Sequence, residues 1–182
     1  MLQKRWRTGF AGMPPAPSLR SWLTEPDSLT ARCQRQAQHF RVRLLASAQG
    51  LALAEDGTGQ WTRVRDVVLE CDGIPVIFAH TSLSTVKRGR LARWLAGLGS
   101  RSLGSLLFAH PGFRRGPIEY CRLRPGDPLY RYAARHATLP SQVWARRSRH
   151  RLGGLEVLVT EVFLPSITNI GHNEDGYYSI KE

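Results

Sequence analysis

The chain has 182 residues, of which 42% are hydrophobic, which is enough for one domain with a buried core. Its 26 lysines and arginines outnumber its 14 aspartates and glutamates, and the net charge of +12 favours an anionic partner such as nucleic acid, a membrane surface or a small polyanionic metabolite. No run approaches the roughly 18 apolar residues of a membrane span, and no RNA- or DNA-binding motif is present, so a membrane-spanning segment and a known nucleic-acid-binding module are both disfavoured.

The cysteines and histidines argue against a metal site or a disulfide framework. Cys33, Cys71 and Cys121 lie far apart without a Cys-x-x-Cys pair, and the six histidines show no metal-ligand spacing. The basic start of the chain, residues 1–7, is not followed by the apolar run of a secretory signal. The sequence therefore predicts a cytoplasmic protein with reduced thiols and no bound metal.

The first half of the chain is predicted to alternate short helices with strands. Asp27 and Ser28 form a good N-cap, and the alternation of Phe40, Val42 and Leu44 with arginines is typical of a half-exposed strand. The expected elements are a loose basic arm over 1–17, helices over 18–23 and 29–37, strands over 40–44, 46–54, 61–71 and 74–80, and a helix over 85–98. Asp72-Gly73 is a strong hairpin signal between the last two strands.

The second half is predicted to be mainly strands. Gly153-Gly154 indicates a hairpin between a basic strand and an apolar one. The expected elements are a short helix up to Phe108, a strand over 117–123, a short helix over 129–136, strands over 144–152 and 155–165, and a polar, acidic tail over 166–182. Strands joined by hairpin-like turns outnumber helices, so the pattern predicts a single α+β domain with a largely antiparallel sheet.

Two charged residues fall on apolar strand faces. Residues 155–165 are apolar on both faces, which is typical of a central strand, yet Glu161 lies on one of them. Arg65 likewise shares a face with Val67 and Leu69. A buried carboxylate needs a cation or a donor, so each residue has a structural interpretation, Glu161 paired with an arginine and Arg65 snorkelling or paired. The two charges are also suited to a small molecule with a carboxylate and a hydroxyl, and they equally suit each other.

Four segments in order resemble the chorismate–pyruvate lyase family, which makes 4-hydroxybenzoate for ubiquinone. Any one of the four is a weak signal, but the ordered set is specific. The segments are Trp22-Leu-Thr with Asp27-Ser-Leu-Thr30, Arg65-Asp-Val-Val-Leu-Glu-Cys-Asp-Gly73, Leu98-Gly-Ser-Arg-Ser-Leu-Gly104 with Leu107-Phe108, and Trp144-x-Arg-Arg-Ser148 with Val159-Thr-Glu-Val-Phe-Leu-Pro165.

The resemblance covers residues 18–165 and implies an antiparallel sheet of about six strands, helices over one face and an enclosed ligand. Arg65 matches the arginine that holds the ligand carboxylate, and Glu161 matches the glutamate at the ligand hydroxyl. Leu29 and Leu103 match positions whose main chain contacts the ligand. Leu29 stands where the family has methionine, and Ser102 stands where the family has a proline. Ser102 belongs to the glycine-containing segment before Phe108, and we expect this segment to form a lid.

The resemblance also implies the reaction, in which chorismate yields 4-hydroxybenzoate and pyruvate without a redox step, a cofactor or a metal. The resemblance suggests a cytoplasmic enzyme, and we expect a monomer. Since 4-hydroxybenzoate and chorismate share the ring carboxylate and the hydroxyl, we also expect the product to inhibit the enzyme. From charge and alternation, one of Arg146, Arg147 or Arg149 is expected to meet the second carboxylate of chorismate.

Two other classes stay open at this point. A non-catalytic effector-binding domain of the same fold predicts a fused DNA-binding domain, and none is visible in this sequence. A basic nucleic-acid-binding protein predicts binding that weakens steeply with salt.

Overall fold

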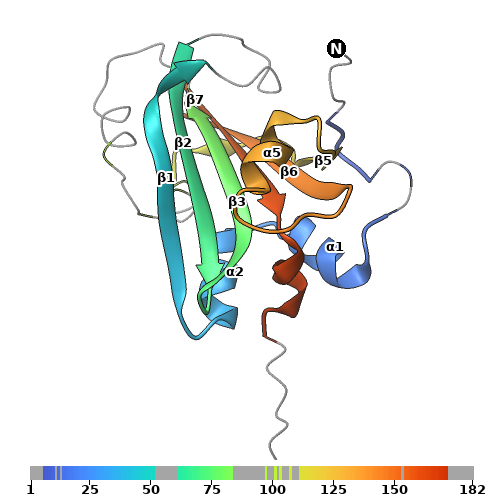
Figure 1. Cartoon of the computed structure of the whole chain (residues 1–182). Coiled ribbons are helices and arrows are strands. Elements are labelled where there is room, and N and C mark those ends of the chain that lie inside the picture. The colour runs from blue at the N-terminus through green and yellow to red at the C-terminus, as the bar shows by residue number, and fades with distance from the viewer. Residues whose placement is uncertain are drawn as a thin grey trace, which may run out of the picture.

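The computed structural model describes residues 6–10, 12, 14–51, 61–83, 97, 101, 103, 107, 111–152 and 154–171 (Figure 1). Its strands are β1 (Phe40–Leu51), β2 (Trp61–Cys71), β3 (Ile74–Leu83), β4 (Arg114–Arg115), β5 (Glu119–Leu123), β6 (Val143–Leu152) and β7 (Leu155–Phe163). Its helices are α1 (Pro17–Leu23), α2 (Leu29–Gln36), α5 (Pro128–Ala133) and the 3-10 helix η2 (Pro165–Asn169). The predicted α+β class is confirmed.

The strands form one antiparallel sheet in the order β1-β2-β3-β7-β6-β4, and β5 also pairs with β6. β7 therefore lies in the interior of the sheet between β3 and β6, which confirms the central strand predicted from its two apolar faces. Val157 and Phe163 are buried on one face, and Leu158 and Val162 are buried on the other.

Two predicted strands are one strand in the structure. Residues 40–44 and 46–54 were expected to be separate, but β1 runs continuously from Phe40 to Leu51. Its register against β2 shifts between Leu44 and Ala46, so Leu45 is the extra residue of a β-bulge that bends the strand without ending it. The predicted hairpin at Asp72-Gly73 is present, and both residues have positive φ, +51° and +80°, as a tight turn of this kind requires.

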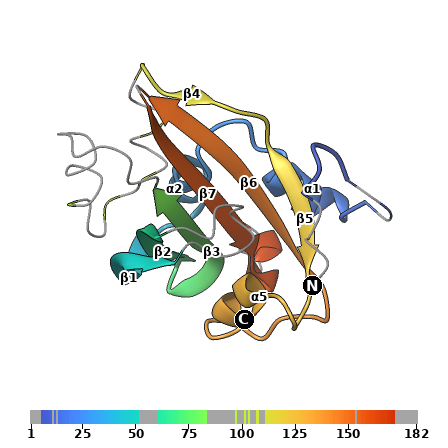
Figure 2. The same ribbon diagram turned by 90° about the horizontal axis from the view of Figure 1, so that it is seen from above.

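Helices cover both faces of the sheet. Trp22, Leu23 and Leu29 of α1 and α2 pack with the β2, β3 and β7 residues of one face. Leu129 and Ala133 of α5 pack on the opposite face, and Figure 2 shows α2 and α5 on opposite sides of the strands. The expectation of helices over one face is therefore wrong for α5. Both faces of the central strands are apolar, so each face needs a covering layer.

The folded unit extends beyond residues 18–165 at both ends. The main chains of Arg7 and Tyr120 exchange hydrogen bonds of 3.1 and 2.7 Å, and the ring of Phe10 lies 4.6 Å from that of Tyr120. At the other end, Ile167 of η2 is 1% exposed and Ser166 Oγ donates to the Pro75 carbonyl. The prediction of a loose arm and a loose tail is therefore wrong for residues 6–10 and 166–171, because their apolar side chains pack on the sheet.

Other predictions fall outside the described residues. The helix over 85–98 lies there except for residue 97, as does most of the segment expected to form a lid, of which Arg101, Leu103 and Leu107 are described. Leu103 and Leu107 are buried and pack in one cluster with Leu83 and Val157.

Candidate active site

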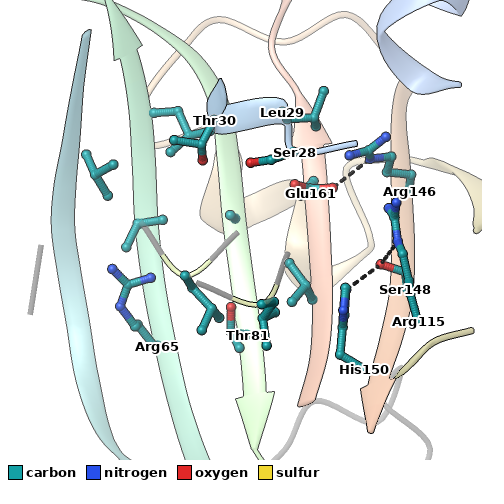
Figure 3. Close-up of a pocket in the computed structure, with 17 residues that line it drawn as sticks. Ser28, Leu29, Thr30, Arg65, Thr81, Arg115, Arg146, Ser148, His150 and Glu161 are labelled. Atoms are coloured by element: carbon teal, nitrogen blue, oxygen red, sulfur yellow. Dashed lines mark hydrogen bonds and ion pairs between the residues drawn. The ribbon is translucent and has the colours of Figure 1, made fainter. Parts of the chain in front are cut away.

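A pocket lies on the face of the sheet that α2 covers (Figure 3). The space among its lining atoms is about 570 Å³, including the part that opens to solvent. Its lining comes from the start of α2, from six strands and from the predicted lid segment. The lining residues are Ser28, Leu29, Thr30, Val42, Arg65, Val67, Leu69, Ala79, Thr81, Leu103, Leu107, Arg115, Arg146, Ser148, His150, Val159 and Glu161.

The described lining combines an apolar surface with an excess of positive charge. The guanidinium groups of Arg65, Arg115 and Arg146 line it together with one carboxylate, that of Glu161. A concave, mainly apolar site with a few charged groups is suited to a small molecule, and the sign of the charge selects an anion.

Arg65 lies on the pocket face of β2 because side chains alternate along a strand, so Arg65, Val67 and Leu69 all point to this face. The arginine is 5% exposed, and its Nη2 donates to the main-chain oxygen of Arg101 at 2.8 Å. Burial lowers the pKa of its guanidinium. An arginine nevertheless keeps its charge at neutral pH, so the pocket receives a fixed cation at this wall.

Glu161 is paired with an arginine from the neighbouring strand. Arg146 of β6 is directly opposite Glu161 of β7 in the register, and its Nε donates to Glu161 Oε2 at 2.6 Å. Arg146 is the partner of Glu161, so the alternative in which Arg65 and Glu161 satisfy each other is wrong. Among the described residues, Glu161 Oε1 has no hydrogen-bond donor, and the carboxylate lines the pocket.

Arg146 also holds the loop that leads into α2. Its Nη1 donates to the main-chain oxygens of Leu23 at 3.3 Å and Glu25 at 2.7 Å, and its side chain is 2% exposed. One buried guanidinium therefore connects the carboxylate of Glu161 to the segment that positions Leu29.

The start of α2 contributes Ser28, Leu29 and Thr30 to the pocket lining. Ser28 caps the helix, and its Oγ accepts from the Ala31 amide at 3.3 Å. The amides of Leu29 and Thr30, the first two helical positions, have no acceptor within the helix. Leu29 and Leu103 are both buried in the pocket lining, so all four residues singled out in the sequence line one pocket.

Three further polar residues line the same wall and were not identified from the sequence. Arg115 Nε donates to Ser148 Oγ at 3.2 Å, and Ser148 Oγ lies 3.1 Å from His150 Nε2. The alternation of Arg146, Ser148 and His150 along β6 was a sufficient signal to place these three on one face. Arg115 comes from a strand of two residues, which is too short to give a periodic pattern.

His150 is neutral in this environment. It is 4% exposed, and burial together with the charges of Arg115 and Arg146 lowers its pKa from 6.5 to about 4. Because an arginine only donates hydrogen bonds, Ser148 Oγ accepts the hydrogen bond from Arg115. The single hydroxyl proton of Ser148 is then directed to His150 Nε2. This order of donors requires an unprotonated Nε2, which agrees with the direction of the pKa shift.

The other two arginines proposed for the second carboxylate point away from the pocket. Arg147 Nε donates to Glu119 Oε2 at 2.8 Å, and its guanidinium lies 4.6 Å from the centre of the Trp6 ring. Arg149 is bonded to Glu156. Of the three candidates on β6, Arg146 alone lines the pocket.

Within the described part of the chain, no group of three or more His, Cys, Asp or Glu side chains is arranged to hold a metal ion. The described helices include none that is long and apolar enough to cross a membrane. Enclosure of a ligand stays a prediction, because most of the expected lid lies outside the described residues.

Comparisons with known proteins agree on one family. A protein of Dechloromonas aromatica is 64% identical over 92% of this chain and 98% of its own length. Proteins of Methylobacillus flagellatus and of an Azoarcus species are 41% and 40% identical over 93% and 84% of this chain, and over 97% and 86% of their own lengths. All three are named "Probable chorismate pyruvate-lyase".

A solved GntR-family transcriptional regulator from Bacillus cereus is a much more distant likeness. It is 16% identical, and a TM-score of 0.48 over 70% of this chain and 92% of that chain is too low to bear on fold or function. The family model described as "Chorismate lyase", in contrast, matches residues 3–170, which include every described residue of the pocket. With that match and relatives of up to 64% identity along nearly their whole lengths, the chain belongs to the chorismate lyase family.

Proposed function

We propose that this protein is a chorismate–pyruvate lyase that converts chorismate to 4-hydroxybenzoate and pyruvate, the first step of ubiquinone biosynthesis. The observation that carries the proposal is that Arg65, Glu161, Leu29 and Leu103, which match family site positions far apart in the sequence, line one pocket. The names of the relatives favour catalysis over the effector-binding alternative.

The charge of the pocket suits this substrate. Chorismate carries two carboxylates, and the described lining holds three guanidinium groups and one carboxylate. Outside the pocket, several arginines are paired with carboxylates, as in the contacts of Arg41 and Arg43 with Glu70.

The spacing of the charged groups suits a ring with para substituents. Arg65 on β2 and Glu161 on β7 are separated by β3, hence by about 10 Å between strand axes, and lie on different sides of the pocket in Figure 3. In the proposed complex, Arg65 binds the ring carboxylate through two hydrogen bonds, and Glu161 Oε1 accepts from the ring hydroxyl. Main-chain groups of Leu29 and Leu103 complete the contacts.

The reaction is an elimination. The ether bond at ring carbon 3 breaks, and its electron pair leaves with the enolpyruvyl oxygen. Ring carbon 4 loses a proton, and the methylene carbon of the departing group gains one to become the methyl group of pyruvate. The ring becomes aromatic, which supplies driving force, so the protein mainly positions the substrate and stabilises the negative charge that develops on the departing group. No electrons are exchanged with an external acceptor, and the proposal includes neither cofactor nor metal.

Product inhibition follows from the same contacts. 4-Hydroxybenzoate keeps the ring carboxylate and the hydroxyl, so Arg65 and Glu161 bind product and substrate alike, and binding of this kind does not speed the chemical step. We expect strong competitive inhibition and release that limits turnover, with the segment containing Leu103 and Leu107 as the lid. A kcat that falls in proportion to added viscogen is the expected result, and a kcat that is independent of viscosity contradicts release as the slow step.

The decisive test uses purified protein, chorismate and excess chelator. Equimolar 4-hydroxybenzoate and pyruvate are expected, and failure to form either product overturns the proposal. Restored growth of a bacterial strain that lacks 4-hydroxybenzoate synthesis tests the place in ubiquinone biosynthesis. We further propose a cytoplasmic monomer, for which sedimentation should give the mass of one 20.5 kDa chain.

A further inference from the structure

The pocket contains a third arginine, Arg115, whose position is set from two sides. Its Nε donates to Ser148 Oγ of β6 at 3.2 Å, and its Nη1 donates to the main-chain oxygen of Pro26, in the loop before α2. Both of these acceptors are oxygens without a formal charge, and the two contacts orient the guanidinium plane in the wall of the pocket.

The three arginines of the pocket differ in their partners and in the strands that carry them. Arg146 is matched by the carboxylate of Glu161. Arg65 lies on β2, and Arg115 lies on β4 at the other end of the strand order, next to β6 (Figure 3). A dianion that spans the pocket therefore meets one cation at each end, Arg65 at the first and Arg115 at the second.

The substituents of chorismate occur in a matching order. Its enolpyruvyl ether is on ring carbon 3, next to the hydroxyl on carbon 4 and away from the ring carboxylate on carbon 1. If the ring carboxylate is at Arg65 and the hydroxyl at Glu161, the enolpyruvyl group lies on the Glu161 side, where Arg115 is found in Figure 3. We propose that Arg115 binds the enolpyruvyl carboxylate and thereby distinguishes the substrate from 4-hydroxybenzoate, an inference that rests on the proposed function.

Ser148 and His150 act as positioning residues for this arginine. The chain of donors runs from Arg115 Nε to Ser148 Oγ and on to His150 Nε2, which fixes the guanidinium by one of its edges. Once one edge of a planar guanidinium is held, the plane of the group is fixed, and a guanidinium presents its donors in a fork geometry that matches a carboxylate.

The assignment has a consequence for catalysis. The enolpyruvyl group carries the negative charge that grows as the ether bond breaks, and it is absent from 4-hydroxybenzoate. A cation on that group therefore stabilises the transition state without strengthening product binding, unlike Arg65 and Glu161. Arg115 is thus the pocket residue whose contact raises turnover without adding to product inhibition.

The test compares substrate and product on one variant. Arg115→Gln is expected to lower kcat/KM for chorismate by about 10- to 160-fold, the range for one to two charged hydrogen bonds, while the Kd of 4-hydroxybenzoate changes by less than about threefold. Arg115→Lys should recover part of the loss. Arg114→Gln, an exposed neighbour on β4 that does not line the pocket, is the matched control and should behave as wild type.

A stable dianionic analogue separates binding from turnover. 3-(Carboxymethoxy)-4-hydroxybenzoate carries a second carboxylate on an ether next to the hydroxyl, so wild type should bind it more tightly than 4-hydroxybenzoate. Arg115→Gln should remove that advantage. Thermal midpoints are measured alongside, and if Arg115→Gln does not fold, Arg115→Lys and Ser148→Ala are compared on the same two ligands.

The outcomes are distinct. Equal losses for the product and the dianion mean that Arg115 only holds the Pro26 loop, and unchanged kinetics mean that it does not touch the substrate; either result overturns the inference. A wild-type protein that forms no product overturns the proposed function instead. An active wild type with a selective loss in Arg115→Gln supports both.

Discussion

Arg65 and Arg146 occupy two walls of one pocket, and both are almost fully buried on strand faces. Arg146 is bonded to the carboxylate of Glu161 through Nε and to the carbonyls of Leu23 and Glu25 through Nη1, so its charge is paired and these two nitrogens donate inside the protein. Arg65, the proposed anchor of the ligand carboxylate, donates to the neutral carbonyl of Arg101. Burial is therefore common to the arginine that is paired with Glu161 and to the arginine that is proposed to bind the ligand.

The comparison implies opposite responses to substitution. Removing Arg146 should damage the fold before it damages chemistry, because it leaves a carboxylate and two carbonyls without donors in a buried place. Removing Arg65 should damage ligand binding and leave the fold nearly intact. Substitutions of Arg146, Arg65 and Glu161 test this division.

Arg146→Leu is expected to lower the free energy of unfolding by about 3–5 kcal/mol, the usual result of breaking a buried ion pair on one side. Urea denaturation measures the loss. The double variant Arg146→Leu/Glu161→Leu should recover part of it, since no unpaired carboxylate is left. A single variant as stable as wild type would show that the pair is not part of the framework.

Arg65→Ala is expected to weaken 4-hydroxybenzoate binding by about 3 kcal/mol, roughly 160-fold, because a carboxylate loses two charged hydrogen bonds. Titration calorimetry measures the affinity, and urea denaturation should show a change in stability well below that of Arg146→Leu. Arg65→Lys should recover only part of the binding, since an ammonium lacks the planar fork. Full activity in Arg65→Ala would make this arginine structural.

Glu161→Gln keeps the shape of the side chain but loses the anionic acceptor, so 4-hydroxybenzoate should bind about 10-fold more weakly. Benzoate, which lacks the hydroxyl, should bind wild type less well than product does and lose little more in the variant. The measurement is the affinity of both ligands for both proteins. Equal losses of affinity for the two ligands would show that Glu161 does not contact the hydroxyl and that its role is the ion pair with Arg146.

The smallest expected effect is a pH dependence from His150. Its pKa is lowered to about 4 in the folded protein by burial and by Arg115 and Arg146, so the unfolded chain takes up the proton first as the pH falls. The contribution of His150 to the free energy of unfolding should therefore decrease between pH 6.5 and about 4 and level off below that. Stability curves of wild type and His150→Gln should converge toward pH 4, and parallel curves would contradict the neutral, buried histidine.

Much of the architecture is determined by the sequence alone. Strand periodicity placed Arg65 with Val67 and Glu161 with Val159 on their faces, and the two apolar faces of residues 155–165 predicted the central position of β7. These features are readable because alternation and turn chemistry are local properties of the chain. The prediction of loose chain ends, which was based on composition, was wrong at both ends. Phe10 and Ile167 pack on the sheet although most of their neighbours in the sequence are polar residues, glycine or proline.

The partners of the charges were decided by the tertiary structure. The sequence contains both Arg146 and Glu161, but the antiparallel register of β6 and β7 brings them opposite each other and away from Arg65. Arg115, from a strand of two residues, meets Ser148 and Pro26 through contacts that span 33 and 89 positions. Ion pairs and hydrogen bonds act over a few ångströms in space, and sequence separation carries no information about which distant groups will share that distance.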